Sequence, residues 1–274
     1  MNGIIFDVKE FALNDGDGIR TTVFFKGCPL KCIWCHNPEG LSSAPELYVK
    51  RNGCRECGLC RRPCSHEECR PFGRCTKICP LDLVKIAGKS YSAAELASKL
   101  LASKDIFEKS GGGVTYSGGE PLLQSDFLIS LAEKLHGKIH QTVETSGYCA
   151  PAIFRSVAKK LDFVIMDVKL ADSTLHKKYT GVGNEKIIKN LKWLKGSGVP
   201  HLFRTPLIPG ITDTEENLLA VSELVGDDKI ELLPYNHLAP AKYESVGRKF
   251  TDLINEEAMS VPNLSIFKNA TLRK

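Results

Sequence analysis

The sequence predicts an α/β fold with a parallel sheet, either doubly wound or closed into a complete or partial (β/α) barrel. Three observations support this prediction. Outside residues 45–86, short β-branched or aromatic runs alternate with amphipathic stretches about six times, as in strands joined by helices. The apolar runs are nearly continuous, as in strands covered on both faces. Residues with chemical character follow the ends of the strands, which is the edge where such folds bind ligands.

The expected strands are bounded by Gly, Pro or Asp. They cover residues 21–27, 112–119, 140–147, 162–169, 201–209 and 229–236. Helices are expected between them. Ser92 with Glu95, and Thr212 with Glu215, have the spacing of capping boxes that open helices. A further helix is expected to end at Gly196.

Composition narrows the class of protein. Of 274 residues, 42% are hydrophobic and 25% charged, which is ordinary for a globular protein with a substantial core. We find no apolar run of about 18 residues and no basic region of a signal peptide, so we expect no membrane association. The formal charge of +5 falls near zero once ten cysteines bind metal as thiolates, and no basic stripe predicts nucleic-acid binding. We therefore expect a cytoplasmic monomer.

Eleven cysteines without an export signal indicate thiolate chemistry rather than disulfides. Cys149 stands alone and is interpreted as a small buried hydrophobe. Residues 45–86 are too poor in aliphatic side chains to build a core, so we expect metal to stabilise them. Within them a C-x2-C-x2-C-x3-C run, the spacing of bacterial ferredoxins, is formed by Cys54, Cys57, Cys60 and Cys64.

A second run follows, with Phe72 where a cysteine is expected. Because the fourth cysteine of such a run ligates the other cluster of a pair, two sites are predicted. The first has four ligands: Cys54, Cys57, Cys60 and Cys79. The second has three: Cys64, Cys69 and Cys75. It could hold a three-iron cluster, a four-iron cluster completed by water, His66 or a nearby Glu, or nothing stable. A pair of zinc sites is the alternative for the whole segment.

The motif after the first expected strand has only three cysteines. Cys28, Cys32 and Cys35 follow a C-x3-C-x2-C spacing, and the next cysteine is Cys54. Three thiolates can hold a four-iron cubane by three of its irons, which leaves the fourth iron open to an exogenous ligand. The same logic separates catalytic from closed structural zinc sites.

With Trp34 before its last cysteine, this motif resembles that of the radical S-adenosylmethionine (SAM) superfamily. More narrowly, several segments resemble, in order, the glycyl-radical-enzyme activating enzymes, and the resemblance covers essentially the whole chain. They are "DGDGIRTTVFFKGCPLKCIWCHNPEG", "GGGVTYSGGEPLLQ", "DVK", "YTGV" and "ELLPYN". A two-cluster insertion after the first motif resembles the activators of dehydratases, decarboxylases and lyases.

The resemblance implies a partial (β/α)6 TIM-like barrel formed by residues 1–44 and 87–274, with a small ferredoxin-like iron–sulfur domain at 45–86. It implies an oxidoreductase with a [4Fe-4S] cluster, bound SAM, and one or two auxiliary iron–sulfur clusters. One electron would cleave SAM to methionine and a 5′-deoxyadenosyl radical, which abstracts hydrogen from a glycine Cα of a partner glycyl radical enzyme. Reduced ferredoxin or flavodoxin would be the electron donor, under anaerobic conditions.

The resemblance also implies site residues. Cys28, Cys32 and Cys35 would hold the catalytic cluster, with Lys169 as a further catalytic residue. The Glu120 carboxylate would accept a hydrogen bond from the ammonium of the methionine moiety. The expected cofactor-binding residues are Trp34, His36, Gly118, Gly119, Glu120, Glu144, Thr145, Asp167, Val168, Lys169, Arg204, Asn236 and His237.

Two positions depart from the family pattern. Asp17 stands where proline is usual, which gives up a fixed φ in that turn. Asn236 stands where histidine usually follows "LLPY", and His237 comes one position later, so either could bond the ribose.

Two other functions are open alternatives. One is another radical SAM enzyme with auxiliary clusters, such as a peptide or sulfatase maturase. Those enzymes usually carry extra cysteines after the barrel, whereas here none follows Cys149. The other alternative is a non-enzymatic iron–sulfur electron carrier.

Overall fold

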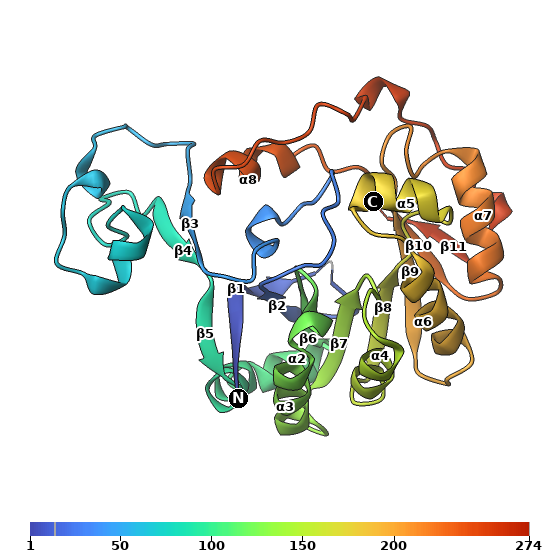
Figure 1. Cartoon of the computed structure of the whole chain (residues 1–274). Coiled ribbons are helices and arrows are strands. Elements are labelled where there is room, and N and C mark those ends of the chain that lie inside the picture. The colour runs from blue at the N-terminus through green and yellow to red at the C-terminus, as the bar shows by residue number, and fades with distance from the viewer. Residues whose placement is uncertain (14, 274) are drawn as a thin grey trace.

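A single open sheet organises the chain (Figure 1). The structure is a computed structural model that describes residues 1–13 and 15–273, and within them nine strands pair in the order β11-β10-β9-β8-β7-β6-β2-β1-β5. The successive parallel strands at its centre are β2 (Arg20–Phe25), β6 (Gly113–Gly118), β7 (His140–Thr145), β8 (Phe163–Asp167), β9 (His201–Pro206) and β10 (Ile230–Leu233). Each overlaps one of the expected strands, so the predicted α/β fold is confirmed.

Three further strands extend the edges of this sheet, and the sequence did not predict them. β1 (Asn2–Ala12) runs antiparallel to β2, and β5 (Lys89–Ser92) runs antiparallel to β1. At the other edge, the short β11 (Ala270–Leu272) is parallel to β10. Most residues of β1 remain partly or fully exposed. A strand with this pattern lacks the continuous apolar run that marks strands buried on both faces.

Helices connect the parallel strands. They are α1 (Ala93–Leu101), α2 (Lys104–Ser110), α3 (Ser125–Leu135), α4 (Pro151–Ala158), α5 (Ser173–Thr180), α6 (Glu185–Lys195), α7 (Glu215–Val225) and α8 (Ala239–Ser245). The Ser92 side chain caps α1 by accepting from the Glu95 N–H at 3.1 Å, as predicted. The prediction for α7 was wrong by two residues. Thr214 is its cap, whereas Thr212 is fully buried and accepts from the Ile208 N–H.

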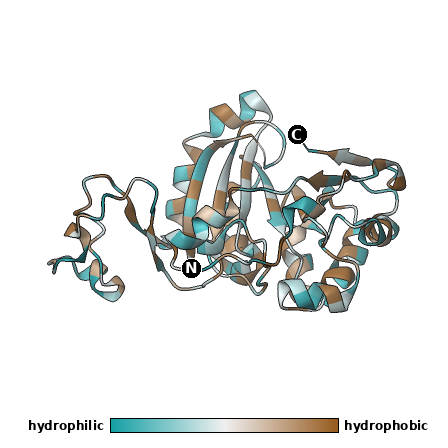
Figure 2. Ribbon diagram, turned by 90° about the horizontal axis from the view of Figure 1, so that it is seen from above, coloured by the Kyte–Doolittle hydropathy of each residue, from teal (hydrophilic) through white to brown (hydrophobic). Residues whose placement is uncertain are grey.

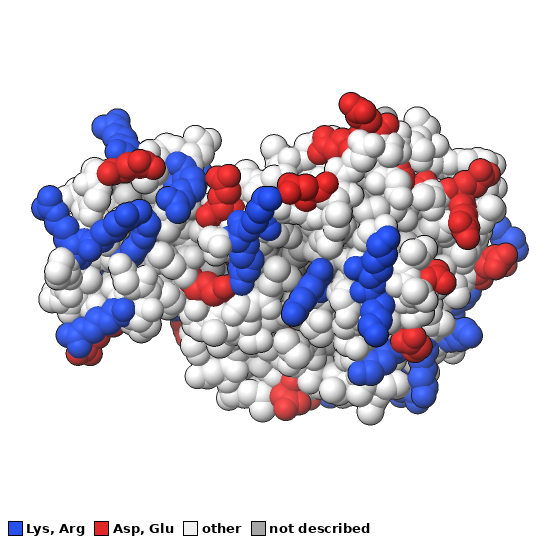
Figure 3. Space-filling model, turned by 45° about the horizontal axis from the view of Figure 1, so that its top comes forward, with Lys and Arg blue, Asp and Glu red and all other residues white. Residues whose placement is uncertain are grey.

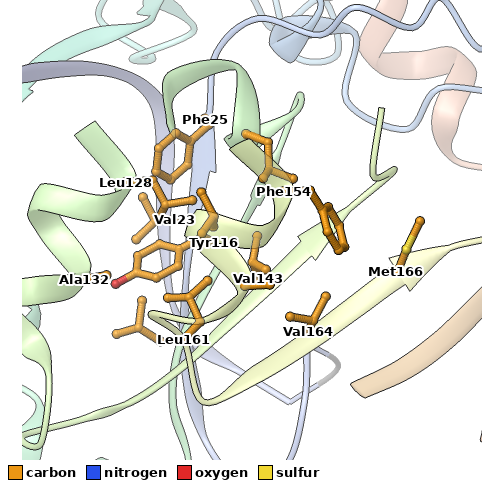
Figure 4. Packing of buried hydrophobic residues seen from close by; sticks show 14 of the residues in the cluster. Val23, Phe25, Tyr116, Leu128, Ala132, Val143, Phe154, Leu161, Val164 and Met166 are labelled. Atoms are coloured by element: carbon orange, nitrogen blue, oxygen red, sulfur yellow. The ribbon is translucent and has the colours of Figure 1, made fainter. Parts of the chain in front are cut away.

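The core lies between the sheet and these helices (Figure 4). Val23, Tyr116, Val143 and Val164 come from four neighbouring strands and are almost inaccessible to solvent. They pack beneath α3 and α4, whose Leu128, Ala132 and Phe154 belong to the same cluster. Burying an aliphatic or aromatic side chain of this size stabilises the fold by about 1.5–3 kcal/mol. This layer fixes the sheet and therefore the positions of its strand ends.

Residues 50–83 form a lobe that stands apart from the sheet in both Figure 1 and Figure 2. Its stem is a two-stranded antiparallel pair, β3 (Glu46–Val49) and β4 (Val84–Ala87). Glu46 anchors the stem, because its carboxylate binds the buried Lys26 Nζ at 2.9 Å and Arg248 Nη2 at 2.5 Å. The lobe itself lacks regular strands or α-helices in the described residues and contains only 3-10 turns.

Among the described residues, no helix has both the length and the apolar character needed to span a membrane.

Candidate functional site

A cavity of about 530 Å³ lies at the carboxyl ends of the parallel strands. This volume is in the usual range of small-molecule sites, about 300–1,000 Å³. The loop after β2, the ends of β6, β7 and β8, and the segment after β10 form its walls. Most of the expected site residues line it: Cys28, Cys32, Trp34, Cys35, His36, Gly118, Gly119, Glu120, Glu144, Thr145, Asp167, Lys169 and Asn236. Distant parts of the chain therefore meet where the sequence predicted.

The three cysteines of the opening motif share this cavity as free thiols of intermediate exposure. Their loop is held against α5, because the Lys31 N–H donates to Thr180 O at 2.7 Å and the Ile33 N–H donates to Tyr179 O at 3.1 Å. Burial raises the pKa of all three thiols, that of Cys32 to about 12. Metal binding requires thiolates, so a cationic centre must supply the compensating charge. Three thiols that line one cavity fit a cluster that leaves one iron open.

Lys169 provides a buried cation beside the cysteines. Its Nζ lies 2.5 Å from a carboxylate oxygen of Asp167, and both side chains are mostly buried. Burial acts to lower the pKa of Lys169, but Asp167 and the neighbouring Cys32 outweigh it, so the pKa is raised. The ammonium therefore stays charged through the neutral range. A fixed positive charge here favours anionic groups in the cavity, such as thiolates or a ligand carboxylate.

Glu144 is the second charged group of the wall, and Arg204 holds it from behind. Arg204 does not line the cavity; it is 3% exposed and donates from Nη1 to Glu144 at 2.8 Å. Ser117 Oγ donates to the other Glu144 oxygen at 2.6 Å. Burial acts to raise the pKa of Glu144, but Arg204 and Ser117 outweigh it and lower the pKa. Glu144 is thus an oriented carboxylate that stays ionised at neutral pH.

Glu120, which was expected to meet a ligand ammonium, is hydrogen-bonded within the protein. Its Oε1 accepts from Thr145 Oγ1 at 2.6 Å and from the Leu122 N–H at 3.2 Å. Its Oε2 accepts from the N–H and the hydroxyl of Ser146, at 2.9 and 2.5 Å. A carboxylate offers about four lone-pair sites, and the protein uses all of them. Glu120 therefore ties its own loop to the end of β7, and its carboxylate has little capacity left for a ligand ammonium.

The glycine pair before Glu120 allows a close approach of three backbone segments. Gly118 has φ of +113°, a conformation that side chains rarely adopt. A Cβ at Gly119 would lie 2.3 Å from Gly27 O and 2.5 Å from Gly40 O. The pair thus brings the backbone of the β6 end against the loop that carries the cysteines.

Trp34 and His36 flank the cysteines from within the cavity wall. Trp34 is 4% exposed and packs in a small apolar cluster with Leu170, Ile208 and Tyr235. His36 Nε2 is buried without a hydrogen-bond partner in the described residues. Burial, with Lys169 and Lys242 nearby, lowers the pKa of His36. A buried polar atom of this kind costs free energy unless a bound molecule satisfies it, which fits a ligand in the cavity.

Three expected residues lie outside the cavity lining. Arg204 acts through Glu144. Val168 is 1% exposed and belongs to the core. His237 is exposed and lies 3.0 Å from Glu256, whereas Asn236 lines the cavity. Of the two candidates for the ribose, the structure therefore brings only Asn236 to the site.

Two lining residues that the sequence analysis missed are Asn37 and Lys242. Lys242 Nζ donates to Asn37 Oδ1 and to a carboxylate oxygen of Glu39, each at 3.1 Å. Asn37 lies two residues after Cys35, in the quoted "CHNPEG" segment, so its position was available as a signal. Lys242 is more than 200 residues away in sequence from these partners and carried no motif.

The lobe gathers one group of its cysteines. The ligand atoms of Cys64, His66, Cys69 and Cys75 all lie within 4.8 Å of one another. Cys69 and Cys75 are buried. The other expected group, which is more exposed, consists of Cys54, Cys57, Cys60 and Cys79. The structure therefore joins His66 to the three cysteines of the second predicted site.

The sequence of this chain matches the Radical SAM superfamily over residues 22–221. It is 37% identical to the (2S)-3-sulfopropanediol sulfolyase activating enzyme of Bilophila wadsworthia (strain 3_1_6), over 90% of each chain. It is 35% identical to the 4-hydroxyphenylacetate decarboxylase activating enzyme of Clostridium scatologenes, over 97% of this chain and 95% of that one.

A solved structure supports the fold. A radical SAM methyltransferase from Sphaerobacter thermophilus superposes with a TM-score of 0.55 at 15% identity, covering 98% of this chain and 76% of that one. The curated relatives are enzymes, which favours the predicted enzyme over an electron carrier. The chain belongs to the radical SAM superfamily and, within it, to the glycyl-radical-enzyme activating enzymes.

Proposed function

We propose that this chain binds SAM in the strand-end cavity and uses it to remove a hydrogen atom from a glycine Cα of a partner glycyl radical enzyme. One observation carries the proposal: three free cysteines share a cavity with a buried cation, Lys169, and an ionised carboxylate, Glu144. This arrangement pairs a cluster site with groups complementary to an amino acid. SAM contains such an amino acid in its methionine moiety.

Cys28, Cys32 and Cys35 would hold the [4Fe-4S] cluster. When bound, the cluster supplies one electron that cleaves SAM to methionine and a 5′-deoxyadenosyl radical. The Lys169 ammonium would attract the SAM carboxylate. Asp167 holds this ammonium in place, with a carboxylate oxygen 2.5 Å from Lys169 Nζ. Glu144 would accept from the SAM ammonium, because the Glu120 oxygens are already engaged by four protein donors. Asn236 would contact the ribose from the segment after β10.

The partner's glycine loop would enter where the sheet is open. In the described residues, the sheet order runs from β11 to β5 without closing on itself. The cavity is bounded there by the segment after β10, where Leu238 is 77% exposed. A loop of another protein needs a side entrance of this kind, which a closed barrel would lack. The relatives activate particular enzymes, whereas for this chain we propose only the class of its partner, a glycyl radical enzyme.

The lobe would carry the electron to the cavity. We assign an auxiliary [4Fe-4S] cluster to Cys54, Cys57, Cys60 and Cys79, whose partial exposure suits electron entry. Residues 45–86 contain nine Lys and Arg against five Asp and Glu, and Figure 3 shows blue side chains gathered on this lobe. Such a surface would attract an acidic donor, reduced ferredoxin or flavodoxin. Activator and donor would meet in the cytoplasm, where this chain would act as a monomer.

Anaerobic reconstitution tests the proposed function. The chain, loaded with iron and sulfide, is mixed with SAM and a chemical reductant, and 5′-deoxyadenosine is measured by chromatography. The same mixture with a candidate glycyl radical enzyme should give a glycyl doublet by electron paramagnetic resonance. If 5′-deoxyadenosine forms but no glycyl doublet appears with any glycyl radical enzyme encoded near the gene for this chain, the proposed partner class is contradicted. The triple Cys→Ala variant of residues 28, 32 and 35 is the blank. If the loaded wild type forms no more 5′-deoxyadenosine than this blank, SAM cleavage is contradicted.

A further inference from the structure

We propose that Cys64, His66, Cys69 and Cys75 bind a single tetrahedral zinc ion in place of a second auxiliary iron–sulfur cluster. Each residue contributes one ligand atom, and these four atoms lie within 4.8 Å of one another. His66 Nδ1 is 3.4 Å from Cys75 Sγ. The four residues span only twelve positions of the chain, in a C-x-H-x2-C-x5-C spacing. Three thiolates and one imidazole form a closed ligand set that is typical of structural zinc.

Distance separates a single ion from a cluster. Zn–S bonds of about 2.3 Å at tetrahedral angles place two ligand sulfurs about 3.8 Å apart. In a four-iron cubane, the irons are about 2.7 Å apart and each thiolate points outward, so ligand sulfurs lie about 6.4 Å apart. The upper bound of 4.8 Å here admits the first geometry and not the second. A three-iron cluster spreads its ligands over separate irons in the same way, so it fits no better.

The surroundings of the thiolates support a metal centre. The Thr76 N–H donates to Cys69 Sγ at 3.4 Å, and the Thr76 hydroxyl lies 3.5 Å from the same sulfur. Hydrogen bonds of this kind stabilise a thiolate, and bonds from outside the ligand set orient the ligands of a metal. Cys69 and Cys75 are 1% and 2% exposed, so the ion would be shielded from solvent. The lobe lacks a core of its own, and a closed metal site would replace one.

This assignment explains Phe72. It stands where the ferredoxin pattern expects a cysteine, and it is the last residue of the 3-10 turn Glu67–Phe72 that also carries Cys69. With His66 as the fourth ligand, the second site no longer needs a cysteine at position 72. The zinc would also order the neighbouring cysteines, because the Cys75 N–H donates to Cys60 O at 2.7 Å. One metal would thus hold the loop on which the electron-relay cluster depends.

Metal analysis of the whole chain, purified anaerobically and then reconstituted with excess ferrous iron and sulfide, tests the proposal. We expect about one zinc per chain, retained after reconstitution, with a zinc X-ray absorption shell of three sulfurs at about 2.3 Å and one nitrogen at about 2.0 Å. Replacement of the zinc by iron during reconstitution would overturn the proposal, and so would a shell of four sulfurs or of light atoms only.

Variants locate the ion. Cys69→Ser should lose the zinc, whereas His66→Cys should keep it and change the shell to four sulfurs. Cys149→Ala is the matched control, because this cysteine lies far from the lobe in sequence and should leave zinc and iron unchanged. If the His66→Cys variant instead gains about three or four irons, the site is an iron–sulfur site. Unaltered zinc in Cys69→Ser would place the ion elsewhere. Because the absorption shell is read on the wild type, misfolding of a variant does not decide the result.

Discussion

Arg204 lies behind Glu144 and divides its guanidinium between two carboxylates. Its Nη1 is 2.8 Å from Glu144, and its Nε is 2.7 Å from Glu231. Of these two carboxylates, only that of Glu144 lines the cavity. The relationship makes Arg204 a positioning residue: it neutralises a buried carboxylate and fixes the oxygen that faces the ligand. One guanidinium thus links side chains of β7, β9 and β10.

Arg204→Ala is expected to destabilise the protein by about 3–5 kcal/mol, because it leaves the mostly buried Glu144 without its ion-pair partner, whereas Glu231 keeps Arg273 at 3.5 Å. Denaturant unfolding followed by circular dichroism measures this loss. The matched control is Lys160→Ala, which breaks an exposed pair with Glu133 at 2.9 Å and should cost less than about 1 kcal/mol. Equal losses of unfolding free energy in the two variants would show that the buried ion pair stabilises the protein no more than the exposed one.

The same pair predicts how that loss depends on pH. The pKa of Glu144 is lowered in the folded protein; burial opposes this, but Arg204 and Ser117 outweigh it. A carboxylate of this kind contributes stability above its unfolded pKa, about 4.3, and loses it as the pH falls through the folded value. The difference in unfolding free energy between wild type and Arg204→Ala should therefore be fully present near pH 7 and shrink as the pH falls below about 4.3. A difference that grows on acidification would contradict this account.

Glu120→Gln distinguishes an internal role from ligand binding. An amide keeps one oxygen, and its NH2 group would face two of the donors that now bind the carboxylate. We expect a loss of about 1–3 kcal/mol in unfolding free energy. Glu133→Gln, on the exposed face of α3, is the control and should be near neutral. If Glu120→Gln leaves the stability unchanged but binds SAM much more weakly, as measured by calorimetry, then Glu120 contacts the ligand.

Sequence patterns predicted the parallel strands because Val23, Val143 and Val164 belong to apolar runs that are buried on both faces of the sheet. They missed β1, because most of its residues are partly or fully exposed and form no continuous apolar run. For α7, the sequence Thr-Asp-Thr-Glu-Glu offered two threonines as caps. Only the tertiary fold decides between them, because it buries the first.

The site was predictable to the extent that motifs mark strand ends. The cysteines, Asp167 and Lys169 all follow that rule, and the structure places them in one cavity. The patterns could not indicate that the Glu120 oxygens are occupied, since Ser146 supplies two of the donors and belonged to no assigned role. They also left His66 as one option among several, because its approach to Cys75 depends on how the lobe folds.

Gly119→Ala should disrupt the contact between the glycine loop and the cysteine loop. The new methyl group would meet two backbone oxygens at 2.3 and 2.5 Å, so one loop must shift. Overpacking of this kind costs about 1–3 kcal/mol. Gly196→Ala is the control, because its nearest atom would be 4.0 Å away. The midpoint of thermal unfolding and the affinity for SAM should both fall for Gly119→Ala and stay unchanged for Gly196→Ala. Equal midpoints for the two variants would contradict the close approach of the loops.

Charge reversal on the lobe tests the path of the electron. Arg55 and Arg62 are exposed near the cysteines of the assigned relay cluster, and the variant Arg55→Glu/Arg62→Glu reverses two charges on that surface. If acidic ferredoxin or flavodoxin docks there, 5′-deoxyadenosine formation with the protein donor should slow about tenfold at low ionic strength and recover partly in salt. The rate with dithionite should not change, because a small reductant needs no docking surface. Lys159→Glu, an exposed reversal just after α4, is the control. A similar loss with both reductants would show that the variant damages the relay itself, and no loss with either would place the donor elsewhere.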